Sequence, residues 1–120
     1  MTLTTALLVA LGAAVGTPLR YLANHGIRAR FGGTPAAGTL LVNVTGSFVL
    51  GILVGAGVGS APLALVGIGF CGALTTFSTL ALELWDALAD DRYAHAVATV
   101  ALSLTLGLGA AWLGWALGGG

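Results

Sequence analysis

Side chains that can recognise an ion without carrying charge gather in one stretch, Gly69–Leu80, which reads G-F-C-G-A-L-T-T-F-S-T-L. The stretch combines two glycines with four hydroxyl side chains, although it lies inside a long apolar run. In hydrocarbon, irregular backbone is tolerated only where protein or a water-filled cavity meets it. We therefore interpret the stretch as a break in a membrane helix, of the kind that holds an ion or substrate near the bilayer midplane. A helix packed closely against its neighbours fits the same composition.

Polar side chains also recur with helical spacing on two further segments. Thr39, Asn43 and Ser47 stand at i, i+4 and i+8, so they share one helix face. An amide in the middle of an apolar span is expensive unless it is hydrogen-bonded or hydrated, so Asn43 either bonds a neighbouring helix or lines a polar path. Thr99 and Ser103 form a second polar face with the same spacing.

The charged residues at the edges of the apolar runs indicate a function less specifically than the uncharged polar residues do. Arg20 lies near the end of the first run, where it either reaches the membrane interface or provides a fixed positive charge near the route of an anion. Glu83 and Asp86 share a face near the end of the third run, and we expect them to be solvated. A proton-relay role for these two carboxylates is the weaker alternative.

Composition decides the protein class. Of the 120 residues, 58% are hydrophobic and 7% are charged, and no charged residue occurs between Phe31 and Leu82. That run as a single helix would be more than twice as long as the roughly 30 Å hydrocarbon core of a bilayer, so it must fold back on itself. Four basic and four acidic side chains cancel, which gives no basic surface for nucleic acid. We conclude that this is an integral membrane protein.

The pattern predicts an all-α membrane protein with one domain, residues 1–120, and spanning helices at about 3–23, 35–57, 63–89 and 93–117. A polar loop is expected at Asn24–Thr34. Pairs of glycines four residues apart, at Gly12 and Gly16 and at Gly51 and Gly55, would let helices approach closely.

The same elements bear on orientation and chemistry. Arg28 and Arg30 fall in the first expected loop and Arg92 in the third, so the positive-inside rule predicts that those loops face the cytoplasm. Cys71, His25, His95 and Glu83 do not form a nucleophile–base–acid set at any convincing spacing, so we predict that the protein is not an enzyme.

The uncharged hydrogen-bond donors described above suit a small anion that must be bound and also released. The polarised edge of the Phe77 ring adds a further anion contact.

Three motifs resemble one known family. Gly69–Leu80 resembles the G-F-C-G-G-x-T-T-F-S-T-F signature of the Fluc/CrcB fluoride channels. Thr39–Gly51 (T-L-L-V-N-V-T-G-S-F-V-L-G) resembles the family's T-L-x-V-N-x-x-G-x-F-x-x-G, and Gly16–Tyr21 (G-T-P-L-R-Y) is similar to its G-A-x-x-R-Y. The matches fall in order in three of the four predicted helices, so the resemblance covers essentially the whole chain.

The resemblance implies a passive fluoride-selective channel in the bacterial inner membrane that exports cytoplasmic fluoride. It implies an antiparallel, dual-topology homodimer with two pores in the lipid bilayer. It also implies a structural Na⁺ at the dimer centre, held by the main-chain carbonyls of Gly72 and Thr75. Together with Arg20, the matching positions predict this fluoride pathway: Arg20, Asn43, Phe77, Ser78, Thr79, Leu80, Thr99 and Ser103.

Two departures from the family pattern matter. Leu80 stands where the family has a second phenylalanine, and Thr99 stands where a tyrosine is common. A leucine lacks the polarised ring edge, which implies either reduced conduction or a second, different homologous subunit beside this one. The rival class is a small, dual-topology multidrug transporter. Such a transporter needs a membrane-embedded carboxylate, which the first helix lacks and which Glu83 would provide only near a helix end.

Overall fold

Long apolar segments of this chain form helices because a membrane leaves the backbone no hydrogen-bond partner except itself. The computed structural model describes residues 2–31 and 35–120, and within these residues it contains helices and no strand. The elements are α1 (Leu3–Phe31), α2 (Pro35–Gly55), α3 (Ser60–Pro62), the π-helical η1 (Leu63–Cys71), α4 (Gly72–Leu74), α5 (Phe77–Ala89) and α6 (Tyr93–Leu117).

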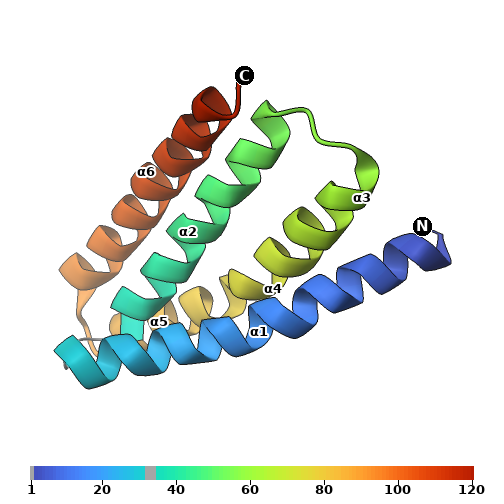
Figure 1. Ribbon diagram of the computed structural model, residues 1–120. Coiled ribbons are helices and arrows are strands. Elements are labelled where there is room, and N and C mark those ends of the chain that lie inside the picture. Colours follow the sequence, from blue (N-terminus) through green and yellow to red (C-terminus); the bar gives the residue numbers. More distant parts are fainter. Residues whose placement is uncertain (1, 32–34) are drawn as a thin grey trace.

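Four segments in the described part of the chain are long and apolar enough to cross a membrane. They are Leu3–Arg30, Ala37–Gly55, Ser60–Ala89 and Tyr93–Leu117. The segments converge where α1 ends and α2 begins, and they fan out toward the turn between α2 and α3 (Figure 1). That turn contains Gly57, whose φ of 64° is a left-handed conformation that glycine adopts without steric cost.

Two helix pairs carry most of the packing, α1 against η1 and α2 against α6. At Gly12 and Gly16, an added Cβ would overlap backbone atoms of the η1–α4 segment. At Gly51 and Gly55, it would overlap the carbonyl oxygens of Ala111 and Trp115 on α6. The predicted close approach at both glycine pairs is therefore confirmed.

The first helix is longer than the sequence predicted. We expected it to end near residue 23 and expected a polar loop at Asn24–Thr34, but α1 continues to Phe31. No proline interrupts residues 24–31, and Arg28 and Arg30 in the last turn favour the negative end of the helix dipole. Polar sequence here extends the helix beyond the apolar segment. Residues 32–34 lie outside the described part of the chain.

The other bounds agree more closely with the prediction. Helix α6 covers the expected residues, α2 ends two residues early at Gly55, and the third segment begins at Ser60. Pro18 lies inside α1 without ending it.

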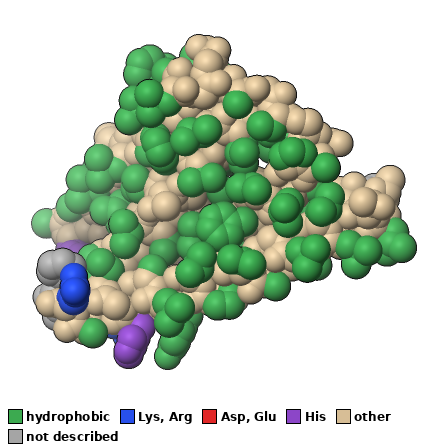
Figure 2. All heavy atoms as spheres, in the orientation of Figure 1, with side chains coloured by type: hydrophobic (Ala, Val, Ile, Leu, Met, Phe, Trp, Pro, Cys, Tyr) green, Lys and Arg blue, Asp and Glu red, His purple; other side chains and the backbone are tan. Residues whose placement is uncertain are grey.

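The outer surface is apolar. Hydrophobic side chains cover most of the face shown in Figure 2, whereas arginine and histidine side chains gather at one end of it. Large apolar residues on α1 and α6 face outward, including Leu3 (76% exposed) and Leu108 (70% exposed). Such a surface needs lipid or another protein around it.

Candidate functional site

The backbone leaves the helical conformation at two threonines between α4 and α5. Thr75 has a ψ of 158°, and Thr76 has φ −149° and ψ 122°, so both are extended. The Thr76 hydroxyl oxygen then accepts a hydrogen bond from the Thr79 N–H at 3.2 Å, which caps the start of α5. The site is therefore built around a helix end and a helix start that meet in the third apolar segment.

Asn43 on α2 satisfies the exposed backbone of Thr76 from the opposite side. Its Oδ1 accepts the Thr76 N–H at 2.7 Å, and its Nδ2 donates to the Thr76 carbonyl at 3.1 Å. Both backbone groups of an extended residue are thereby paired. Because an amide carries two N–H groups, Asn43 keeps one donor beyond this pair of bonds.

Arg20 reaches the same place from α1. Its Nη1 donates to the Thr75 carbonyl at 3.4 Å, and its side chain is half-buried. The Thr75 hydroxyl in turn donates to the Cys71 carbonyl at 2.9 Å. This contact places the positive charge of Arg20 beside the backbone of Thr75 and Thr76.

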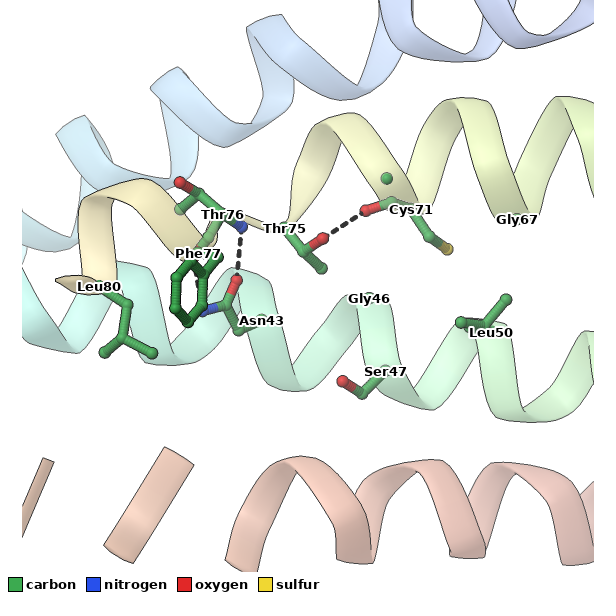
Figure 3. A pocket seen from close by; sticks show the side chains of 11 residues that line it. Asn43, Gly46, Ser47, Leu50, Gly67, Cys71, Thr75, Thr76, Phe77 and Leu80 are labelled. Atoms are coloured by element: carbon green, nitrogen blue, oxygen red, sulfur yellow. Dashed lines mark hydrogen bonds between the residues drawn. The ribbon is translucent and has the colours of Figure 1, made fainter. Parts of the chain in front are cut away.

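Thr75, Thr76, Asn43 and Cys71, but not Arg20, border a cavity of about 310 Å³ that we call the break pocket. Figure 3 shows Asn43 and Phe77 side by side at one end of it, with Leu80 beyond them. Phe77 is 81% exposed, so it forms an open edge of the pocket rather than a buried wall. The lining residues are Asn43, Gly46, Ser47, Leu50, Gly67, Cys71, Gly72, Thr75, Thr76, Phe77 and Leu80.

Comparison with known proteins identifies the family. The family described as "CrcB-like protein, Camphor Resistance (CrcB)" matches residues 7–115. The chain belongs to the CrcB family. The match includes the second and third apolar segments completely, most of the first and the last, and every residue of the break pocket.

Curated CrcB relatives are similar over nearly the whole chain. The "Fluoride-specific ion channel FluC 2" of Rhodococcus jostii is 46% identical, with 94% of this chain and 97% of the relative covered. The "Fluoride-specific ion channel FluC 1" of Nocardia farcinica is 43% identical, with 88% and 74% covered. The corresponding FluC 1 of Geobacillus kaustophilus is 42% identical, with 93% and 96% covered.

The predicted pathway residues of this CrcB chain divide among several places. Asn43, Phe77 and Leu80 line the break pocket. Thr79 lines a second pocket, and the exposed Ser78 has its hydroxyl 3.3 Å from that of Thr76.

The two predicted residues on α6 lie outside both of these pockets. The Thr99 hydroxyl donates to the His95 carbonyl of its own helix at 2.8 Å. Ser103 is half-buried on the same helix, which packs against α2.

One residue and one contact were missed by the sequence analysis. Thr76 was not among the predicted pathway residues, although its position three residues before Thr79 is a capping signal. Glu83 was expected to be solvated, and this was wrong. Its Oε1 accepts a hydrogen bond from the buried Thr39, and its Oε2 is buried without a partner among the described residues. Helix α5 turns this carboxylate toward α2, which the i, i+3 pattern of Glu83 and Asp86 does not reveal.

Main-chain oxygens are the available metal ligands of the site. Within the described residues, no cluster of three or more histidine, cysteine or acidic side chains could hold a metal ion. Because α4 ends at Leu74, the carbonyls of Gly72 and Thr75 lack helical N–H partners. A Cβ at Gly72 would meet no atom within 4 Å, so that side is open. Carbonyl oxygens are suitable ligands for a hard cation, although Arg20 already contacts Thr75.

Proposed function

We propose that this protein is a subunit of a passive, fluoride-selective channel and not an enzyme. The observation that carries the proposal is the break pocket, where Asn43, Thr76 and Phe77 meet in a chain whose CrcB relatives are named fluoride-specific ion channels. Uncharged donors replace part of the water around fluoride without holding it too tightly to leave. The protein is a multi-pass component of a bacterial cell membrane and lowers the cytoplasmic fluoride concentration.

The pathway uses the groups that the sequence predicted. Fluoride meets the free N–H of Asn43 and the ring edge of Phe77, and Ser78, Thr79 and Ser103 continue the hydroxyl surface. The Arg20 guanidinium contributes a fixed positive charge 3.4 Å from the Thr75 carbonyl. Leu80 keeps the wall apolar beside Phe77, and Thr99 borders the path on α6.

The working unit is an antiparallel dimer of two copies inserted in opposite orientations. The break pocket is open at Phe77, and the apolar faces of α1 and α6 leave ample surface for a partner. Pairing with a second homologous subunit is the alternative. The carbonyls of Gly72 and Thr75 would hold a structural Na⁺ at the dimer centre, where the ion would fix the two breaks relative to each other.

Fluoride efflux from liposomes that contain the pure protein tests this function. We expect a fluoride-selective electrode to record release down a gradient, whereas a chloride gradient in matched liposomes should persist. Liposomes without protein supply the background rate. Equal release of both anions would refute the proposed fluoride selectivity. Release of neither anion would refute the proposed channel function.

A further inference from the structure

A second pocket, of about 330 Å³, lies near the end of α1 and is lined by residues from three elements. We call it the arginine pocket, and its lining consists of Tyr21, Asn24, His25 and Arg28 of α1, Thr39 of α2 and Thr79 of α5. Asn24 lies directly over Gly38 of α2, where a Cβ would overlap the amide oxygen. The glycine therefore makes room for a polar side chain at this place.

The basic groups of the arginine pocket carry its positive charge. Arg28 is exposed and makes no ion pair with a described residue, whereas Arg92 pairs with Asp90 at 3.6 Å. The His25 ring stacks on Tyr21 with a centroid separation of 6.1 Å and an interplanar angle of 10°. The acidic group nearest to the lining is Glu83, which bonds Thr39 in the wall.

Hydroxyl groups connect the arginine pocket to the break pocket. Thr79 lines the first pocket and Thr76 lines the second, and the Thr76 hydroxyl donates to the Thr79 hydroxyl at 3.1 Å. Thr76 is also the residue that Asn43 holds by two hydrogen bonds. The Thr79 and Thr76 hydroxyls therefore link the lining of the arginine pocket to the residue that Asn43 holds.

We propose that the arginine pocket is an anion-entry site, in which Arg28 concentrates small monovalent anions and delivers them to Thr79. The proposal rests on the proposed channel function and adds the residues that admit the ion. A cleft lined by one sign of charge raises the local concentration of counter-ions and therefore the rate of entry. Glu83 on α5 opposes this field, but its carboxylate is hydrogen-bonded to Thr39 in the wall, whereas Arg28 is exposed and makes no ion pair with a described residue.

The matched pair Arg28→Gln and Arg30→Gln tests the entry site. Both arginines lie in the last turns of α1 and are exposed, but Arg30 lines neither pocket. At low ionic strength we expect Arg28→Gln to lower fluoride efflux about threefold, and the loss should fade at high salt because screening weakens surface charges. Arg28→Lys, which keeps the charge, should restore the flux, and Arg30→Gln should leave it unchanged.

The outcomes separate this inference from the channel function. If the wild type releases fluoride but Arg28→Gln equals it at low salt, the entry site is refuted and the channel stands. Equal losses in Arg28→Gln and Arg30→Gln would also refute it, because they would indicate a general surface field. If the wild type releases no fluoride, the channel function itself fails.

Discussion

At the residue scale, the behaviour of the site depends on how Asn43 divides its hydrogen bonds. Two of its polar groups hold Thr76 at 2.7 and 3.1 Å, and one N–H remains. Asn43 bonds a neighbouring segment, which is one of the two roles that the sequence left open, and its side chain lines the break pocket.

Asn43→Asp should lower fluoride efflux about tenfold, equivalent to about 1.4 kcal/mol. The substitution removes the bond from Nδ2 to the Thr76 carbonyl and adds a negative charge beside the anion. Asn43→Ala, which loses the bonds without adding charge, separates the two effects in the same liposome measurement. Unchanged flux in Asn43→Asp would assign the amide to packing alone.

Leu80→Phe should maintain or raise the flux. Leu80 lines the break pocket with Phe77, and a ring there would provide a second electropositive edge. Leu82→Phe is a suitable control because Leu82 is 59% exposed on the same helix and lines neither pocket. A large loss specific to Leu80→Phe would mean that residue 80 does not occupy an aromatic contact position.

At the element scale, glycines set the distance between helices and so the width of the site. A Cβ at Gly114 of α6 would overlap the Phe48 carbonyl oxygen of α2, just as Gly51 and Gly55 of α2 lie against α6. The α2–α6 pair is therefore in backbone contact, and α2 is the helix that carries Asn43.

Gly114→Ala should lower the melting temperature in detergent, whereas Gly109→Ala should not. Overpacking at Gly114 costs about 1–3 kcal/mol. Gly109 lies on the same helix with no atom within 4 Å of an added Cβ, and alanine there improves helix propensity. Similar melting temperatures for both variants would show that α2 and α6 do not pack through this glycine.

At the scale of the whole molecule, one copy leaves much of its apolar surface uncovered. Leu3 and Leu108 are mostly exposed, and the break pocket opens at Phe77. A chain of 11.8 kDa buries little of its apolar surface alone. The remaining faces of α1 and α6 require lipid, a second copy, or both.

The purified protein should therefore have a mass of twice 11.8 kDa after correction for bound detergent. Light scattering coupled to size-exclusion chromatography gives this mass directly. Coexpression with a differently tagged copy distinguishes self-association from pairing with another subunit. A single-chain mass that persists as the protein concentration rises would contradict the dimer.

The sequence by itself determined the membrane class, the four apolar segments and the glycine faces. These features follow from composition and from helical periodicity, which are local properties. Helical spacing brought out Asn43, the family resemblance brought out Leu80, and both line one pocket with Phe77. The end of α1 was predicted too early because polar residues continue a helix as readily as they end one.

Only the tertiary structure decided which polar groups pair across the helices. Thr76 donates one hydrogen bond to Asn43 and accepts one from it, Thr75 accepts one from Arg20, and Glu83 accepts one from Thr39. Each contact joins residues more than thirty positions apart. Its geometry depends on how the helices pack, and helix periodicity defines a residue's own face but not the residue opposite it.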